Sequence, residues 1–291
     1  MKVSFVTTVL NEEGSIKDLL DSLITQTKKP DEVIIIDAGS TDKTVNLIKP
    51  YQKKLNLKIS KHNDCNRSQG RNKGVKLAKH QVVAISDAGC TLKNDWLKKI
   101  TKPLENSKSD SVAGFYLVKA DNIFQKCISL FLATIPEKLN KDTYLPSSRS
   151  VAFKKTAFDK AGKYPENLEF CEDLVFAQNL KTKTKMFVEP KALVYWQMTN
   201  NLFTFFHQIK NYTYGDIKAK HKPHLNKIKR IYLRYLLFLI LPIGFPVYIL
   251  ATTIFMFKYI KTPLALIYLP IIRITTDLAM ILGSIKGKID S

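Results

Sequence analysis

Three acidic side chains follow short apolar runs in this 291-residue chain, and their spacing could bring them to one site. Each run is followed within three positions by a carboxylate, and these carboxylates belong to Glu12, Asp37 and Asp87. If the runs are parallel strands, their carboxyl ends meet at one edge of a sheet, where α/β proteins bind ligands. Carboxylates without a local basic partner suit hydrogen bonds to a base or ribose, or the ligation of a hard divalent cation.

The segment Asp37-Ala38-Gly39-Ser40-Thr41-Asp42 has a second, purely structural interpretation. It also fits a turn followed by a helix, because Ser, Thr and Asp are good helix N-caps. Both roles are compatible if Ser40 or Thr41 caps the helix while Asp37 faces the ligand. Neither a Gly-x-Gly-x-x-Gly nor a Walker pattern follows the first run, which disfavours the usual dinucleotide and P-loop folds.

The elements that would position these residues alternate along the first hundred positions. We predict strands at residues 3–9, 33–36, 57–60 and 82–86, and helices at residues 15–27, 41–51 and 68–79. The run 33–36 is apolar on both faces, which is typical of a central parallel strand covered by helices on each side. The alternation predicts an α/β fold with a doubly wound, mostly parallel sheet.

Residues 111–200 are less regular, and we expect them to pack on the same sheet. The patterns there predict strands at residues 111–118, 148–153 and 192–196, and a helix at residues 172–181. Two side chains in this part are candidate ligand contacts. Arg149 lies in a polar stretch that is either a turn or an acceptor or phosphate contact. Trp196 could stack on a sugar or pack in the core.

Five ordered motifs resemble the inverting nucleotide-sugar glycosyltransferases of family 2, which have the GT-A fold. They are Asn11-Glu12, Asp37-Ala38-Gly39-Ser40-Thr41-Asp42, Arg71-Asn72-Lys73-Gly74, Asp87-Ala88-Gly89 and Glu172-Asp173. The resemblance covers roughly residues 1–215, which we predict to be the GT-A domain. Two motifs depart from the family pattern, because Ala38 and Gly89 each replace a second Asp.

The resemblance implies binding of a nucleotide-diphosphate sugar and a role for each matching residue. Asp173 would be the catalytic base that takes the proton of an acceptor hydroxyl, and attack opposite the leaving group would invert the anomeric centre. Asp87 would approach the ribose and a divalent cation, Mg²⁺ or Mn²⁺. The other substrate-binding residues would be Thr8, Leu10, Glu12, Asp37, Arg71 and Glu172, with Arg149 and Trp196 as the candidates named above.

Two of these assignments have alternatives. Without the resemblance, Glu172 and Asp173 would be interpreted as helix N-terminal charges that complement the dipole. Gly89 leaves the metal to Asp87, the diphosphate oxygens and water, which Mg²⁺ accepts. A metal-independent site also stays open, in which Arg71, Lys73 or Arg149 neutralises the diphosphate.

The net charge of +21 is concentrated in a way that indicates a membrane surface. A basic segment at residues 216–234 precedes residues 235–257, which carry no charge and could span a bilayer as a helix. A second apolar segment at residues 264–285 contains Arg273 and Asp277, four positions apart and able to neutralise each other. We therefore predict one or two membrane helices in residues 235–285. The basic segment places the catalytic domain in the cytoplasm, and we expect no nucleic-acid partner.

The leading hypothesis is a membrane-anchored transferase that moves a sugar from a nucleotide donor to an acceptor hydroxyl, in glycolipid or cell-surface glycan synthesis. The acceptor could be lipid-linked. Three alternatives stay open. The first is a polyprenyl-phosphate glycosyltransferase, whose phosphate acceptor needs little help from a base. The others are a nucleotidyltransferase and a catalytically inactive, polybasic membrane adaptor, which Ala38 and Gly89 suggest.

Overall fold

The computed structural model describes residues 1–105 and 108–290, and it divides into two compact units. The first unit comprises Met1–Leu117 and Asn140–Gln197, and the second comprises Val118–Leu139 and Met198–Ser291. The boundary predicted at residue 215 differs from this division, because it lies inside a helix of the second unit. Sequence composition changes at the basic segment, whereas the compact unit also takes in the preceding helix.

The described residues of the first unit form a sheet with the strand order β3-β2-β1-β4-β7-β6-β8-β5. The strands are β1 (Val3–Val9), β2 (Glu32–Asp37), β3 (Leu57–Lys61), β4 (Val82–Ile85), β5 (Cys90–Leu92), β6 (Ser111–Lys119), β7 (Val151–Lys154) and β8 (Met186–Gln197). The first four are parallel, and β7 and β6 continue the sheet in antiparallel fashion. The α/β prediction with its parallel core is thus confirmed.

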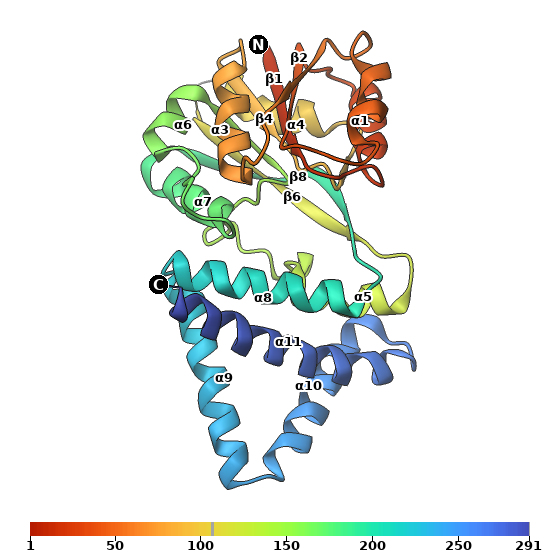
Figure 1. Cartoon of the computed structure of the whole chain (residues 1–291), viewed down its shortest axis with the longest axis vertical. Coiled ribbons are helices and arrows are strands. Elements are labelled where there is room, and N and C mark those ends of the chain that lie inside the picture. The colour runs from red at the N-terminus through yellow and green to blue at the C-terminus, as the bar shows by residue number, and fades with distance from the viewer. Residues whose placement is uncertain (106–107, 291) are drawn as a thin grey trace. The chain divides into compact units, whose positions relative to one another are not determined.

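Helices cover both faces of this sheet (Figure 1). They are α1 (Ile16–Ile24), α2 (Thr44–Ile48), α3 (Arg67–Leu77), α4 (Trp96–Glu105), α6 (Lys155–Ala161) and α7 (Glu172–Lys183). The aromatic rings of Phe153, Phe158 and Phe176 pack together where α6 and α7 meet the sheet. Helix α3 approaches β1 closely at Gly74, where an added Cβ would lie 2.4 Å from Val6 Cγ1. Glycine at this position therefore fixes how near α3 can lie to the strand.

Several elements differ from the sequence predictions. Strand β5 and helices α4 and α6 were not predicted, and Pro50 divides the expected helix 41–51 into α2 and a 3₁₀ turn at Lys49–Tyr51. Strand β7 begins at Val151 because the preceding residues form a turn, in which the Ser150 amide donates to the Ser147 carbonyl at 3.0 Å. Strand β8 is longer than the predicted segment 192–196.

The second unit is helical in its described residues. Its helices are α5 (Ile123–Leu132), α8 (Leu202–Lys218), α9 (Lys222–Ile240), α10 (Gly244–Ile260) and α11 (Ala265–Ile289), and a 3₁₀ turn covers Pro136–Lys138. Figure 1 shows α11 lying along α8. An added Cβ at Gly283 would lie 2.3 Å from the Lys210 carbonyl oxygen, so small residues of α11 permit this close packing.

The uncharged run 235–257 is not one helix, which corrects the expectation of a single helical span. Helix α9 ends at Ile240 and α10 begins at Gly244, because Pro242 cannot continue the backbone hydrogen-bond ladder of α9. The two helices diverge from the short link between them and form a hairpin (Figure 1). We call α9, residues 241–243 and α10 the apolar hairpin.

Helix α11 is the one helix among residues 1–105 and 108–290 that is long and apolar enough to cross a membrane. In its most apolar 18-residue window, 39% of the residues are buried within the protein. Arg273 forms an ion pair with Asp277, which is fully buried and also accepts a hydrogen bond from the Tyr248 hydroxyl at 2.8 Å. The expected neutralisation of these two charges is confirmed.

Candidate active site

The loops after β1 and β2 are joined side by side by hydrogen bonds. The Glu12 amide donates to Thr44 Oγ1 at 2.7 Å, and the Thr41 amide donates to Asn11 Oδ1 at 2.9 Å. Asn11 has a φ of 55°, a conformation that Asn tolerates better than most residues. The Asn-Glu and Asp-Ala-Gly-Ser-Thr-Asp motifs therefore form one continuous rim at the carboxyl ends of the central strands.

Asp37 lies at the end of β2 and is fully buried. Its Oδ1 atom accepts a hydrogen bond from the Ser40 amide at 3.0 Å, so the Asp37 side chain stabilises the turn that follows β2. Its Oδ2 atom is buried and has no hydrogen-bond partner among the described residues. A buried carboxylate oxygen without a donor is costly, and a ligand N–H would satisfy it.

The neighbours of Asp37 on β1 differ in exposure. Thr8 is half-buried and pairs with Ile36 in the sheet. A Cβ added at Gly70 would lie only 2.7 Å from the Thr8 methyl group. Leu10 is 54% exposed. Glu12 accepts a hydrogen bond from Ser15 at 2.5 Å, but burial raises its pKa above the usual value for a glutamate.

Arg71 joins two carboxylates that are far apart in the sequence. Its Nη2 atom lies 2.8 Å from Asp87 Oδ1, and its Nη1 atom lies 2.6 Å from Glu172 Oε1. The guanidinium also lies over the Tyr164 ring, 5.2 Å from the centroid. Because the Arg71 side chain is only 4% exposed, these partners surround a buried cation. Its two Nη atoms thus contact the Asp87-Ala88-Gly89 and Glu172-Asp173 motifs.

The pKa values in this cluster follow from burial and from Arg71. Burial alone would raise the pKa of Asp87, but Arg71 and Arg149 outweigh it and hold the value below the usual range. Burial raises the pKa of Glu172, and the adjacent Asp173 carboxylate adds to this effect, against the opposing influence of Arg71. Asp87 is therefore an anion at neutral pH, held by a shared guanidinium.

Asp173 lies in the first turn of α7, next to Glu172. Cys171 precedes the helix with a φ of 61°, in the left-handed region, and this turn sets the direction in which α7 begins. The Asp173 carboxylate accepts a hydrogen bond from Ser147 Oγ at 3.3 Å and is only half-buried. It is thus accessible, close to the Arg71 cluster, and able to accept a proton from a bound molecule.

Arg149 and Trp196 form a second pair at this site. The guanidinium carbon of Arg149 lies 3.7 Å from the centroid of the Trp196 ring and 5.1 Å from that of Tyr116. Trp196 on β8 pairs with Cys90 on β5, three residues beyond Asp87. The stacking holds the planar guanidinium on an aromatic face, and Arg149 remains close enough to lower the pKa of Asp87.

The residues around Asp87 fit a hard divalent cation. About a third of the Asp87 side chain, 32%, is accessible to solvent, so the carboxylate can reach a ligand as well as Arg71. An added Cβ at Gly89 would meet nothing within 4 Å, so the position of the missing second carboxylate is open space. One carboxylate with room for water and phosphate oxygens suits Mg²⁺ or Mn²⁺.

The predicted site residues other than the exposed Leu10 therefore fall into three neighbouring groups within the first unit. Thr8, Glu12 and Asp37 lie at the strand rim; Arg71, Asp87, Glu172 and Asp173 form the charged cluster; and Arg149 stacks on Trp196. Sequence reasoning missed the aromatic partners Tyr116 and Tyr164, and no local pattern distinguishes either from a core tyrosine.

Comparison with known proteins finds a matching family profile and several relatives. Residues 4–161 match the family profile described as glycosyl transferase family 2. The chain is 30% identical over 185 residues to poly(ribitol-phosphate) beta-N-acetylglucosaminyltransferase TarS of Staphylococcus aureus strain MW2, covering 60% of this chain and 32% of TarS. The chain thus spans about a third of the length of this curated relative.

Two solved structures show the same fold. The S. aureus TarS 1–349 structure in complex with UDP-GlcNAc matches with a TM-score of 0.57 and 19% identity, covering 100% of this chain and 93% of that one. The mannosyltransferase PcManGT from Pyrobaculum calidifontis, in complex with GDP-Man and Mn²⁺, matches with a TM-score of 0.67 and 17% identity, covering 100% and 88%.

Proposed function

Because this chain belongs to glycosyl transferase family 2, we propose that it transfers a sugar from a uridine diphosphate sugar to an acceptor hydroxyl. The observation that carries the proposal is the cluster in which Arg71 links Asp87 to Glu172, beside the half-buried carboxylate of Asp173. In this cluster Asp87 and Arg71, which suit a cation and a diphosphate, lie next to Asp173, which suits the acceptance of a proton. These are the two demands of sugar transfer from a nucleotide.

The choice of uridine follows from Asp37. An ionised carboxylate only accepts hydrogen bonds, and one of its two oxygens is already occupied by the Ser40 amide. The remaining buried oxygen can accept one N–H. Uracil offers a single ring N–H, whereas guanine offers a ring N–H and an amino group side by side, which suit a carboxylate with both oxygens available. The one unpartnered oxygen of Asp37 therefore favours UDP over GDP.

Sugar transfer needs a side chain that takes the proton of the attacking hydroxyl. This side chain has to lie on the face of the donor sugar from which that hydroxyl attacks. In our proposal Asp173 takes the proton of the acceptor hydroxyl as that oxygen bonds to the anomeric carbon, and the bond to the diphosphate breaks on the opposite face. Arg71 pairs with Glu172 next to Asp173, and Arg149 offers positive charge near Asp87. A bound divalent cation at Asp87 would neutralise charge on the diphosphate.

The relatives support a choice of donor and acceptor. TarS is named as an enzyme that transfers N-acetylglucosamine to poly(ribitol-phosphate), and its structure was solved with UDP-GlcNAc. We therefore propose UDP-GlcNAc as the first donor to try, and a polyol-phosphate or other cell-surface glycan hydroxyl as the acceptor class. The proposal rests on the first unit, which holds every residue it uses.

The donor assignment is tested by calorimetric binding of UDP and GDP with Mn²⁺, followed by hydrolysis of UDP-GlcNAc, UDP-glucose and GDP-mannose by the full chain. We expect binding and slow hydrolysis for the uridine compounds only. In the variant Gly89→Asp, the open space would receive a second carboxylate, and we expect UDP binding to need several-fold less Mn²⁺.

The matched control for Gly89→Asp is Gly89→Asn, which fills the same space without adding a charge. If both variants bind Mn²⁺ and UDP like the wild type, the proposed cation position at Asp87 is wrong. Binding of GDP in preference to UDP would contradict the role of Asp37, and no binding of either nucleotide would favour the catalytically inactive adaptor.

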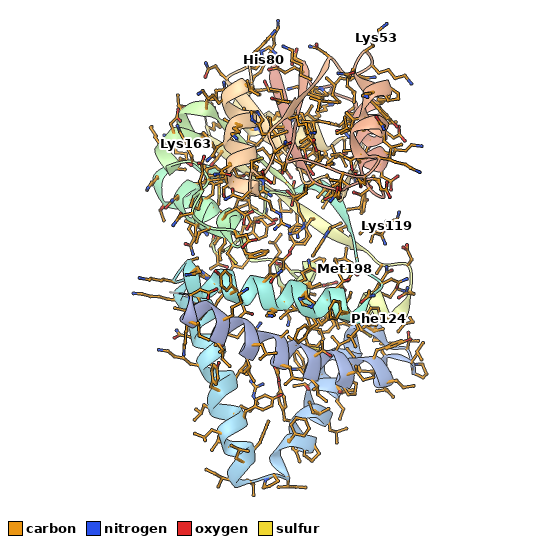
Figure 2. All side chains as sticks on the ribbon, in the orientation of Figure 1. Lys53, His80, Lys119, Phe124, Lys163 and Met198 are labelled. Atoms are coloured by element: carbon orange, nitrogen blue, oxygen red, sulfur yellow. The ribbon has the colours of Figure 1, made fainter. Side chains whose placement is uncertain are left out.

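We further propose that the apolar hairpin enters an anionic membrane surface from one side. Its tip is exposed and apolar, with Leu239 80%, Ile240 75% and Ile243 64% exposed, and Figure 2 shows side chains projecting from α9 and α10 where no other helix covers them. Both outer ends of the hairpin are basic, at Lys222, Lys227, Lys229 and Arg230 in α9 and at Lys258 and Lys261 after the apolar part of α10.

The lengths of the two arms support entry from one side. The uncharged part of α10, residues 244–257, is about 21 Å long at 1.5 Å per residue, and that of α9 is about 9 Å. Neither reaches the roughly 30 Å thickness of a bilayer hydrocarbon core. In our proposal the basic residues at both ends contact anionic headgroups of the cytoplasmic leaflet, and the catalytic unit lies on the cytoplasmic side of the membrane.

Vesicle flotation tests the hairpin. We expect the full chain to float with vesicles that contain phosphatidylglycerol, and the double variant Ile240→Lys/Ile243→Lys to remain in the soluble fraction, since it puts two charges at the apolar tip. The control is Leu77→Lys, which changes a 51% exposed leucine of α3 in the first unit. Flotation of the tip variant at the wild-type level would contradict the proposal.

A further inference from the structure

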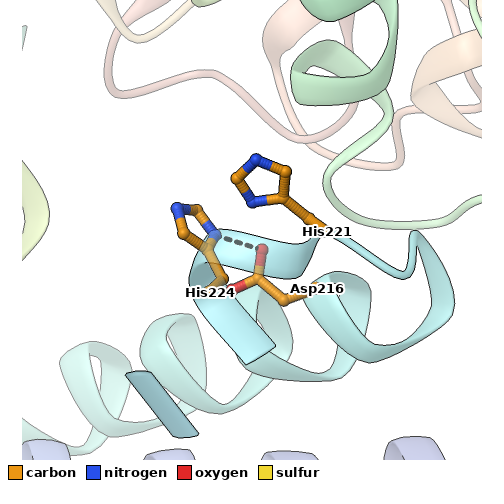
Figure 3. A group of neighbouring side chains, drawn as sticks. All are labelled: Asp216, His221 and His224. Atoms are coloured by element: carbon orange, nitrogen blue, oxygen red, sulfur yellow. Dashed lines mark hydrogen bonds and ion pairs between the residues drawn. The ribbon is translucent and has the colours of Figure 1, made fainter. Parts of the chain in front are cut away.

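A second cluster of metal-ligating side chains lies in the second unit, at the junction of α8 and α9. Asp216 belongs to the last turn of α8, His221 is the N-cap of α9, and His224 lies in the first turn of α9 (Figure 3). One ligand atom from each of these residues lies within 4.8 Å of the other two. None of the three belongs to the candidate active site.

The contacts within this cluster leave one imidazole nitrogen unsatisfied. His224 Nδ1 lies 2.6 Å from Asp216 Oδ1, and the two imidazole rings meet edge to face with centroids 4.2 Å apart. His221 Nδ1 is buried and has no hydrogen-bond partner among the described residues. A buried polar atom of this kind needs an explanation, and a ligand that accepts its lone pair provides one.

The donor set of the cluster favours a transition metal over a hard cation. Burial lowers the pKa of His221 and the nearby His224 lowers it further, against the opposing influence of Asp216. Only one carboxylate is present, in a segment rich in lysine at positions 218, 220 and 222. Such a site does not suit Mg²⁺ or Ca²⁺, which need several oxygen ligands.

We propose that Asp216, His221 and His224 bind one Zn²⁺ ion, with a fourth position open to water. Two imidazole nitrogens and one carboxylate oxygen form a donor set that zinc accepts in tetrahedral geometry. Metal–ligand distances of about 2.0–2.2 Å place ligand atoms about 3.3 Å apart, so the rings and the carboxylate need to move together by about an ångström. Rotation of the partly exposed imidazole side chains can supply this movement.

A zinc ion bound to these residues would hold the link between α8 and α9 in one conformation. The three residues flank Ala219 and Lys220, and Lys220 has a φ of 51°, in the left-handed region that non-glycine residues adopt reluctantly. Binding would fix the direction in which α9, and with it the apolar hairpin, leaves α8. The inference does not depend on sugar transfer or on the donor, because it uses none of the residues of the candidate active site.

Calorimetric titration of the full chain without a polyhistidine tag tests the site. We expect one Zn²⁺ per chain at the cluster, with the binding lost in His221→Gln and in His224→Gln. The matched control is His207→Gln, which changes a histidine of α8 that meets the Phe203 ring edge to face. Mg²⁺ at the same concentration is expected to give no signal from the cluster.

Three further measurements separate a loss of metal binding from a loss of folding. Without metal, His221→Gln and the wild type are expected to unfold at the same temperature, because His221 Nδ1 has no partner to lose. With Zn²⁺, trypsin cleavage after Lys218 and Lys220 is expected to slow several-fold in the wild type and not in His221→Gln. In the unsubstituted chain, bound Co²⁺ should give the intense visible bands of four-coordinate N/O ligation.

The proposal is overturned by any of three results. The first is an aqueous-like Co²⁺ spectrum of the wild-type chain. The second is zinc binding by His221→Gln equal to that of His207→Gln. The third is trypsin cleavage of the wild type at Lys218 and Lys220 that Zn²⁺ does not change.

Discussion

Replacement of Asp173 by Asn is expected to reduce the rate of sugar transfer by about 10²–10⁴-fold, the usual contribution of a positioned general base. The amide keeps the size of the side chain and can still accept the hydrogen bond from Ser147, but it cannot take the proton of the acceptor hydroxyl. UDP affinity is expected to stay unchanged, because the proposed contact of Asp37 with the base does not involve Asp173. Steady-state transfer assays and UDP calorimetry measure the two effects separately.

The control for this variant is Asp159→Asn, which makes the same change at an exposed position on α6. It should behave like the wild type in both assays. Near-normal turnover by Asp173→Asn would remove Asp173 as the base. It would instead favour a phosphate acceptor, as in the polyprenyl-phosphate glycosyltransferase alternative, because a phosphate oxygen needs little deprotonation at neutral pH.

Replacement of Arg71 by Met is expected to lower the free energy of unfolding by about 3–5 kcal/mol, the usual cost of breaking a buried ion pair from one side. The Arg71 side chain is 4% exposed, and its removal leaves Glu172 buried and Asp87 partly buried without their cation. Urea unfolding at neutral pH measures the change. Arg71→Lys should recover only part of it, since one ammonium cannot reproduce the fork that contacts both carboxylates.

The control for Arg71→Met is Arg67→Met, on the same helix but exposed, where we expect a change below about 1 kcal/mol. The pH dependence gives a second check. In the wild type, the lowered pKa of Asp87 stabilises the fold above the normal aspartate pKa, and this contribution is lost as the pH falls through the lowered value.

Without Arg71, burial raises the pKa of Asp87 above that of the unfolded chain, and the pKa of Glu172, which is already raised in the wild type, rises further. The folded variant then binds more protons than the unfolded one, so its stability increases as the pH is lowered toward those values. The difference between wild type and Arg71→Met should therefore shrink from neutral to mildly acidic pH. A small, pH-independent difference, like that of Arg67→Met, would contradict the structural role of the Arg71 cluster.

The sequence predicted the parts of the fold whose signals are local. The first four strands were predictable because each is a short aliphatic run, and β2 is buried on both faces. Helix α4 was missed because Pro103 and several lysines interrupt its apolar pattern, although Trp96 and Ile100 are fully buried. Pro242 and Pro246 predicted a kink in the uncharged run of α9 and α10, and the break between the two helices was missed because membrane helices also tolerate proline without ending there.

The candidate site was predictable only as a set of motifs. Glu12, Asp37 and Asp87 could be expected at one sheet edge because parallel strands end together. The contact between Arg71 and Glu172 joins residues 101 positions apart, and nothing in either local sequence specifies the partner. Likewise, the stacking of Arg149 on Trp196 depends on the antiparallel strands at the far side of the sheet, whose order the sequence did not reveal.

The one-sided entry proposed for the hairpin has a consequence for how the product travels. A chain segment that returns to the surface it came from offers no passage for a polar glycan through the lipid. Sugars added with a cytoplasmic donor would therefore accumulate on the inner face of the membrane. Delivery of the finished glycan to the cell exterior would then depend on a separate translocating protein.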